Sequence, residues 1–280
     1  QWRVWFFQWR GPRTPAVAPV LLAVDRESLA LDQLLSPAER QASPLWSRMG
    51  AWPWPRALQA DLAAAVLERG AARVVFNIVT SQPSRYGPGD DAAFRRRLAP
   101  WRQRLVLAAS LGSSEQGGLA ELQLQRTLYA GFAPEGLTTL LQSPQGITEA
   151  IPGRRWLQQS LADFPPPHPL PLAFAAAQSA LPQQPLAINY AGPAGSLPQV
   201  PAWQVLQQPE GFWRGRTVLI GATASELGDQ QETPYGPQSG AEVQAAALAT
   251  VMEGSGQRGL ALPLQLAVLL GWWIVAGLAL

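Results

Sequence analysis

The sequence predicts an α/β fold in which a mainly parallel sheet is flanked by helices, with an irregular insertion and a transmembrane helix after the domain. Residues 20–24 form a continuous apolar run, which is typical of a strand buried on both faces. A second run at residues 73–79 follows a helical pattern at residues 58–66. Strand, helix and strand joined by short connections imply a right-handed crossover, and therefore parallel pairing of the strands.

The composition excludes several classes of function. The chain has 280 residues, a net charge of +2 and no cysteine. Because the charge is small and the arginines are scattered, the chain lacks the basic field that nucleic-acid binding requires. Disulfides, thiol chemistry and cysteine zinc sites are excluded, and the single histidine, His168, does not make a catalytic triad or a histidine metal site. We therefore expect no catalytic residue, metal or cofactor in this segment.

The first predicted helix is preceded by an unusual string, Trp-Pro-Trp-Pro-Arg at residues 52–56. Proline suits the first turn of a helix, and Gly70 is a suitable stop. We expect the Trp54 ring to pack under the loop that follows the first strand. The same arrangement would bring Arg56 near Asp25.

After the second strand the pattern changes twice. Asp90 and Asp91 open a helical run, where carboxylates cap free amides and complement the helix dipole. Residues 105–110 then predict a third buried strand. From residue 111 to 169 the periodicity fades among Gly, Pro, Gln and Ser. We expect an irregular insertion there, with short strands and one helix around residues 120–128.

Regular patterns return in the last part of the domain. Residues 170–180 are rich in alanine and predict a helix. Residues 186–190 and 216–221 predict a fourth and a fifth strand. A final helix is predicted over residues 240–252, with Gly254 as its stop.

Both ends of the chain carry features of a membrane protein. Residues 261–280 are about 20 mostly apolar residues, enough to span the hydrocarbon core as a helix, although a buried helix of a soluble protein is the alternative. Residues 1–13 mix Trp and Phe with Arg and Gln, which suits either a membrane interface or a partly buried helix. We expect a membrane-proximal segment at 1–16, a domain at 17–254, a linker at 255–260 and then the transmembrane helix.

A candidate binding site lies where the predicted strands end, because ligands of open parallel sheets bind outside the carboxyl ends of the strands. Taken singly, each polar side chain there could instead pair or cap a loop, as Asp25 could with Arg56. Taken together, they favour a shared crevice for a small molecule. The residues at or within reach of this rim are Asp25, Arg56, Asn77, Ser110, Gly221, Asp229 and Thr233.

Several stretches carry a resemblance to a known family. They are LLAVDRESL at 21–29, WPWPRAL at 52–58, ERGAARVVFNI at 68–78, INYAGP at 188–193, RTVLIGATASELGD at 216–229, TPYG at 233–236 and GAEVQA at 240–245. In this order they resemble the CHASE-type extracytoplasmic sensory domain, type two. That family sits outside the bacterial cytoplasmic membrane and is attached to cyclases, histidine kinases and Ser/Thr kinases.

The resemblance implies a sensory region at the cell membrane, with residues 17–254 extracytoplasmic. It would bind an unknown small molecule or sense the state of the envelope, and a kinase or cyclase output domain would follow the chain. Membrane lipid and a second copy of the chain are expected partners; nucleic acid is not.

The chain departs from the family pattern at polar positions. Asn77 stands where the family usually has Asp, Gln244 where it usually has His, and the loop at 145–149 lacks the usual Asp and Arg. Amide chemistry is kept at residues 77 and 244, but titration is lost. The candidate ligand-binding residues are then Asp25, Arg56, Asn77, Asp229, Thr233 and Gln244.

Two other functions remain open from the sequence. The first is a membrane-anchored hydrolase or transferase that uses Asp25 and Asp229. The second is a packing or dimerisation module that binds no ligand. A nucleophile beside a base would favour the enzyme, and a closed rim at the strand ends would favour the module.

Overall fold

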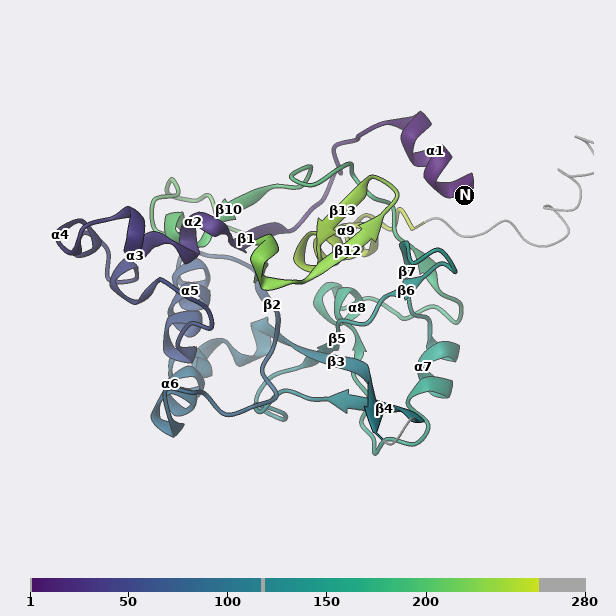
Figure 1. Ribbon diagram of the computed structural model, residues 1–280, viewed down its shortest axis with the longest axis horizontal. Coiled ribbons are helices and arrows are strands. Elements are labelled where there is room, and N and C mark those ends of the chain that lie inside the picture. The colour runs from purple at the N-terminus through teal and green to yellow at the C-terminus, as the bar shows by residue number, and fades with distance from the viewer. Residues whose placement is uncertain (1, 117–118, 257–280) are drawn as a thin grey trace, which may run out of the picture.

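A mainly parallel sheet forms the centre of the computed structural model, which describes residues 2–116 and 119–256 (Figure 1). Its strands lie in the order β10-β1-β11-β2-β3-β5-β8, and each neighbouring pair in this path is parallel. The strand β4 pairs antiparallel with β3. The strands are β1 Val20–Val24, β2 Arg73–Val79, β3 Leu105–Gln116, β4 Leu119–Gln125, β5 Glu135–Leu137, β8 Leu170–Pro171, β10 Gln199–Pro201 and β11 Thr217–Ala222.

Smaller sheets and the helices surround this sheet. One small sheet joins β6 Leu141–Gln142, β7 Thr148–Ile151 and β9 Leu186–Ala187, and a hairpin joins β12 Gln230–Thr233 to β13 Gly236–Ser239. The α-helices are α1 Trp2–Arg10, α2 Arg26–Leu29, α3 Leu31–Leu34, α4 Pro37–Arg40, α5 Arg56–Glu68, α6 Pro88–Leu98, α7 Arg154–Ser160, α8 Leu172–Ala177 and α9 Gly240–Glu253. Short 3-10 helices are η1 Trp46–Arg48, η2 Ala99–Arg104, η3 Ala202–Gln204 and η4 Ser225–Leu227.

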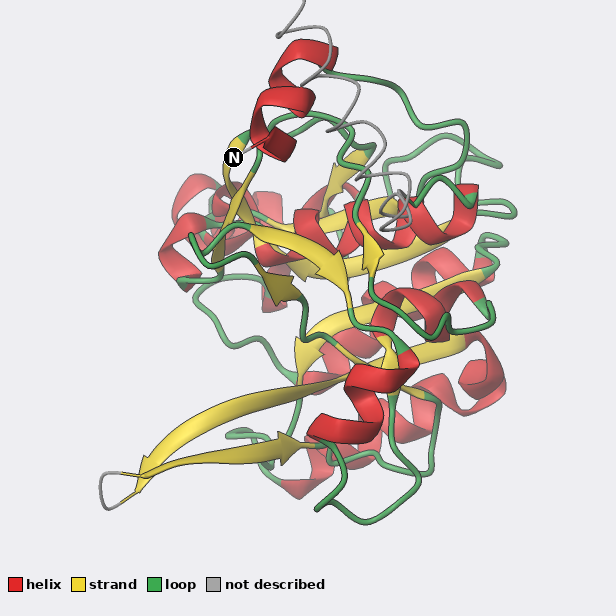
Figure 2. Cartoon of the chain, turned by 90° about the vertical axis from the view of Figure 1, so that its right-hand side faces the viewer, coloured by secondary structure: helices red, strands yellow, loops and turns green. Residues whose placement is uncertain are grey.

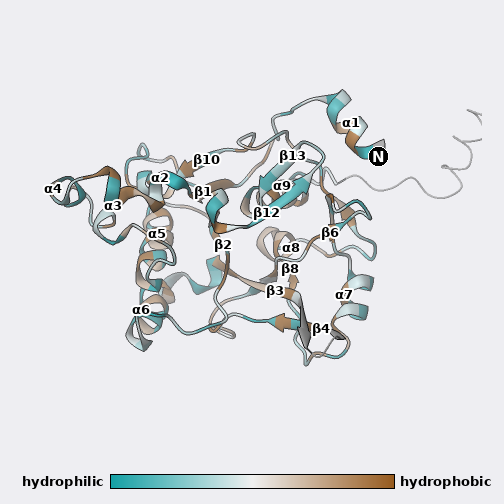
Figure 3. Ribbon diagram, in the orientation of Figure 1, coloured by the Kyte–Doolittle hydropathy of each residue, from teal (hydrophilic) through white to brown (hydrophobic). Residues whose placement is uncertain are grey.

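Alternate residues of each central strand face two separate cores. In β1, Leu22 packs into the core that holds α5 and α6, whereas Leu21 packs into the core that holds α8 and α9. Val74 and Val75 of β2 divide in the same way. The central strands therefore have no solvent-facing side, which explains their continuous apolar runs and the brown colour that several of them carry in Figure 3. The predicted α/β class with a parallel sheet and flanking helices is confirmed.

The first predicted helix is confirmed as α5, and it is capped by Asp90, which was expected to cap its own helix, α6. Asp90, in the first turn of α6, accepts hydrogen bonds from the backbone amides of Arg56 (2.7 Å) and Ala57 (2.9 Å). Asp91 accepts from the Ser84 amide and from the Tyr129 hydroxyl. The two carboxylates thus tie α6 to its neighbours, because α6 and α5 lie side by side on one face of the sheet (Figure 1).

The helix predicted around residues 120–128 is wrong. The segment forms β4, which pairs with the extended second half of β3 in a long antiparallel hairpin (Figure 2). The alternation Leu-Gln-Leu-Gln at 122–125 has the period of a strand rather than of a helix. Because β3 continues beyond Ser110, it supplies the hydrogen-bonding partner that this alternation requires.

The strand predicted at residues 186–190 forms only over Leu186–Ala187, and it does not join the main sheet. β9 pairs antiparallel with β7. Beyond it the backbone bonds elsewhere: the Ile188 amide donates to the Glu149 carbonyl and the Asn189 amide to the Thr250 hydroxyl. The first bond holds the segment to β7 and the second to α9.

The N-terminal segment forms α1, a helix with one buried and one exposed face. Phe7 is buried against the body of the domain, whereas Trp5 (65%) and Trp9 (74%) are exposed and stack on each other. Tyr235 Oη lies 2.8 Å from the Gly11 carbonyl oxygen, so the β12–β13 hairpin also contacts this segment. The partly buried helix expected as one alternative is present, with its aromatic rings divided between core and solvent.

Within residues 2–116 and 119–256, no helix is long and apolar enough to cross a membrane. The transmembrane helix predicted at residues 261–280 lies outside the described residues. So does most of the linker predicted at 255–260.

The last helix, α9, ends at a clamp on the N-terminal segment. Gly254 follows Glu253 in the left-handed conformation (φ 63°), as expected for a helix stop. Glu253 accepts hydrogen bonds from the Arg13 guanidinium (2.6 Å), the Ser255 hydroxyl (2.8 Å) and the Ala16 amide. Burial alone would raise the pKa of Glu253, but these hydrogen bonds and the Arg13 charge outweigh it and lower the pKa to about 2.

We expect the stabilisation from Glu253 to be present above about pH 4.5 and to be lost as the pH falls towards about 2. The reason is that its pKa in the folded chain lies below its ordinary value of 4.5, so the folded state resists protonation. Urea unfolding of the wild type and of Glu253→Gln across this range should show the difference in free energy of unfolding shrinking by on the order of 1 kcal/mol, the scale of a solvent-screened ion pair. A difference that does not change with pH would contradict the clamp.

Candidate functional site

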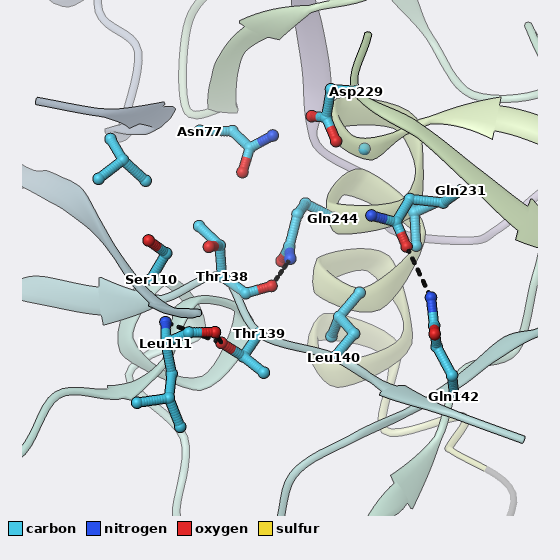
Figure 4. Close-up of a pocket in the computed structure, with 13 residues that line it drawn as sticks. Asn77, Ser110, Leu111, Thr138, Thr139, Leu140, Gln142, Asp229, Gln231 and Gln244 are labelled. Carbon is cyan, nitrogen blue, oxygen red and sulfur yellow. Dashed lines mark hydrogen bonds between the residues drawn. The ribbon is translucent and has the colours of Figure 1, made fainter. Parts of the chain in front are cut away.

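A cavity opens near the ends of β2 and β5, beside the middle of β3 and the start of α9. Its volume is about 520 Å³. Polar side chains from several elements line it, as the close-up in Figure 4 shows. They include Asn77 of β2, Ser110 of β3, Thr138 after β5, Asp229 before β12, Gln231 of β12 and Gln244 of α9.

Two glycines bring α9 close enough to form this cavity. A methyl group on Gly221 of β11 would lie 2.6 Å from the Cβ of Ala241 and 3.3 Å from that of Asn77. A methyl group on Gly240 would lie 2.2 Å from Asp229 Oδ2. Only glycine therefore allows the first turn of α9 to cross the end of the sheet with the Asp229 carboxylate against it.

Asp229 is the only charged side chain that lines the cavity within the described residues. The residue as a whole is exposed, but its carboxylate lies against Gly240 in the first turn of α9. Burial of the carboxylate raises the pKa of Asp229, and the neighbouring Gln231 side chain opposes that shift. A partly desolvated carboxylate is thus held at the mouth of an otherwise neutral, polar cavity.

The two amide side chains, Gln244 and Asn77, differ in burial and in hydrogen bonding. Gln244 is buried (4% exposed) one turn after Gly240, and its Nε2 donates to the Thr138 carbonyl. This bond joins α9 to the loop after β5. Asn77 is half-buried at the end of β2, and no hydrogen-bond partner of its side chain occurs among the described residues.

Three of the six predicted ligand-binding residues thus meet in one cavity, and three do not line it. Asp25 caps α2 by accepting from the Ser28 amide (2.9 Å). Thr233 is buried and closes the β12–β13 turn by donating to the Gly236 carbonyl (2.7 Å). Arg56 starts α5, and no ion pair joins it to Asp25 in the described part of the chain, so the pairing considered as an alternative is not present there.

The cavity lies at the strand ends, where the sequence predicts the candidate binding site. The family model of the CHASE2 domain matches residues 4–279. The chain belongs to the CHASE2 domain family. No curated protein and no solved structure matches it.

CHASE2 domains are extracellular sensory domains of signalling receptors. Asn77 and Gln244, two of the positions that were expected from the sequence to depart from the family pattern, both line the cavity beside Asp229. The cavity therefore keeps hydrogen-bonding groups at these positions while carrying a single carboxylate.

Sequence reasoning missed part of the lining. Thr138 follows β5, a strand of three residues that begins Glu-Gly and carries no apolar run. Gln142 and Gln231 come from small sheets outside the main one, and Gln231 Oε1 accepts from the Thr148 hydroxyl (2.9 Å). Only the parallel pairing of β5 with β3, which is seen in the structure, brings Thr138 to the main sheet.

Proposed function

We propose that this chain is the sensory region of a membrane-bound signal-transduction receptor, with residues 17–254 outside the cytoplasmic membrane. It senses a small molecule that binds in the cavity at the strand ends. A kinase or cyclase output domain follows the chain, and this segment itself is not an enzyme. Membership of the CHASE2 family supports the sensory role and the extracellular location.

One observation carries the sensing mechanism: a single helix connects the cavity with the exit of the chain. Gly240 and Gln244 at the start of α9 line the cavity. Glu253 at its end binds Arg13 of the N-terminal segment, and the chain then continues towards residues 257–280. A ligand that prefers one position of the first turn of α9 therefore shifts the population of positions at the other end.

The enzyme alternative lacks comparable support. Asp25 caps α2, whereas Asp229 lies in the cavity, so the two carboxylates do not line one site. Ser110 and the threonines of the cavity have carbonyl, amide or amide-oxygen partners rather than a base that would activate them.

Absence of cysteine from the chain allows one experiment to test location and sensing together. In the full-length receptor, a single Asn77→Cys substitution places a thiol in the cavity at a side chain without a hydrogen-bond partner. In spheroplasts with an intact cytoplasmic membrane, we expect a membrane-impermeant thiol reagent to label it from outside. A concentrated small-molecule extract of the growth medium should slow this labelling several-fold, because a bound ligand covers the cavity.

The matched control is Gln33→Cys, on the exposed surface of α3 and away from the cavity. It should be labelled from outside at a rate that the extract does not change. Labelling of both cysteines only after the membrane is permeabilised would contradict the location. Labelling of Asn77→Cys at one rate with and without extract would contradict sensing through this cavity.

A further inference from the structure

The cavity presents several oxygen atoms that can accept hydrogen bonds from a ligand. Gln244 uses one N–H of its side-chain amide on the Thr138 carbonyl, so its amide oxygen and one N–H remain for a ligand. The hydroxyl of Thr138 donates to the Ala109 carbonyl, and that of Thr139 to the Leu111 carbonyl. Each hydroxyl has spent its only hydrogen and keeps lone pairs that accept.

The remaining amides include a further oxygen acceptor. Gln231 accepts from Thr148 through its oxygen and keeps its NH₂ group beside Asp229, so this donor faces an acceptor of the cavity itself. The Asn77 amide has no partner among the described residues and can turn its oxygen to the cavity. Neutral oxygen acceptors of Gln244, Asn77 and the two threonines therefore line the same cavity as the Asp229 carboxylate.

The charge of the cavity favours a cationic ligand. Among the described residues no arginine lines it, the sequence has no lysine, and Asp229 takes part in no ion pair. A carboxylate that is partly removed from water without a counter-ion is unfavourable. A bound cation that also donates hydrogen bonds relieves this cost.

The start of a helix ordinarily favours anions, but the first turn of α9 is already occupied. The Gly240 amide donates to the Asp229 backbone carbonyl (2.9 Å), and the Glu242 amide donates to Ser239 Oγ (3.3 Å) in a capping box. The carboxylate of Asp229 lies directly on this turn. An anionic ligand would therefore meet a like charge and few free amides.

We propose that the cavity binds a small molecule through a primary ammonium group. This group forms an ion pair with Asp229 and donates hydrogen bonds to the side-chain oxygens of Gln244 and Asn77. An ammonium group carries three donors and one positive charge, and the cavity offers one carboxylate and neutral oxygens around it (Figure 4). This inference rests on the proposed function and adds the chemical class of its ligand.

Isothermal titration calorimetry of the full chain with three probes of similar length tests the ligand class. The probes are 1,4-diaminobutane, 1,4-butanediol and succinate. We expect the diamine to bind at millimolar concentration or below, and the diol and the dicarboxylate to bind at least about tenfold more weakly, because only the diamine pairs with the carboxylate.

Three variants locate the effect. Asp229→Asn should weaken diamine binding about tenfold or more. Asp163→Asn removes the same charge at an exposed position that has no hydrogen-bond or ion-pair partner among the described residues, and it should leave diamine binding unchanged. Asn77→Asp adds a second carboxylate to the cavity and should tighten the binding of the diamine. Urea unfolding of each variant confirms that the compared proteins are folded.

The proposal is overturned if the wild type binds the diamine no better than the diol, or if Asp229→Asn and Asp163→Asn behave alike. Binding of Ca²⁺ that depends on Asp229, without binding of the diamine, would replace the ammonium group by a metal ion. If extract protects Asn77→Cys from labelling while no amine binds, sensing stands and only the ligand class fails. If extract gives no protection either, the proposed function fails as well.

Discussion

Trp54→Ala is expected to lower the free energy of unfolding by about 3–5 kcal/mol, the range for removing a large aromatic side chain from a core. The ring is 2% exposed and lies in the core beneath α5, among residues that include Leu31 and Met49. Its Nε1 also donates to the Gly50 carbonyl (2.7 Å). The substitution therefore leaves both a cavity and an unpaired carbonyl, and urea unfolding measures the sum.

Two further variants separate these contributions. Trp54→Phe keeps most of the side-chain volume and loses the hydrogen bond. It should therefore lower the free energy of unfolding by about 1 kcal/mol more than a substitution at an exposed position does. Trp9→Ala removes a ring that is 74% exposed and should change stability by less than about 0.5 kcal/mol. If Trp54→Ala unfolds at the same urea concentration as the wild type, the ring is a surface feature and the predicted packing is wrong.

Gly221→Val is expected to destabilise the domain by about 1–3 kcal/mol and to abolish binding in the cavity. A Cβ atom at residue 221 would lie 2.6 Å from that of Ala241, so α9 must move away from β11. Because Gly240 and Gln244 line the cavity from the same end of α9, this movement takes the binding groups with it. Urea unfolding and diamine titration measure the two effects.

Gly112→Val is the matched control, since Gly112 is also a strand glycine but has nothing within 4 Å of an added Cβ. It should leave stability and binding nearly unchanged. Adding Ala241→Gly to Gly221→Val should restore part of the stability, because the two positions share one contact. If Gly221→Val binds diamine like the wild type, the position of α9 does not set the site.

The central strands could be predicted from the sequence because their physical signal is local. Residues 20–24 and 73–79 appear in the structure with the same bounds, since strands buried on both faces need continuous apolar runs. The predicted helix at 240–252 is confirmed as α9, with a capping box at Ser239 and a left-handed glycine at its end.

The short strands and single helix of the insertion were predicted, but the position of the helix and the pairing of the strands were not, because they depend on partners far away in the chain. β4 is a strand only because β3 continues past Ser110 to pair with it. β5 joins the main sheet with only three residues, held by parallel pairing to β3. Asp90 caps α5 rather than α6 because the two helices are neighbours in space, which the order of residues does not specify.

The candidate site likewise has a part that could be predicted from the sequence and a part that could not. The sequence by itself determined that polar residues follow buried strands, and so placed Asn77 and Asp229 among the candidates, whereas Gln244 was added by the resemblance to the family. Only the tertiary structure decided that these three meet while Asp25, Arg56 and Thr233 serve as a cap, a helix start and a turn. The physical reason is the close approach at Gly221 and Gly240: which strand ends share a cavity depends on where a helix can cross the sheet, and that depends on packing between residues distant in sequence.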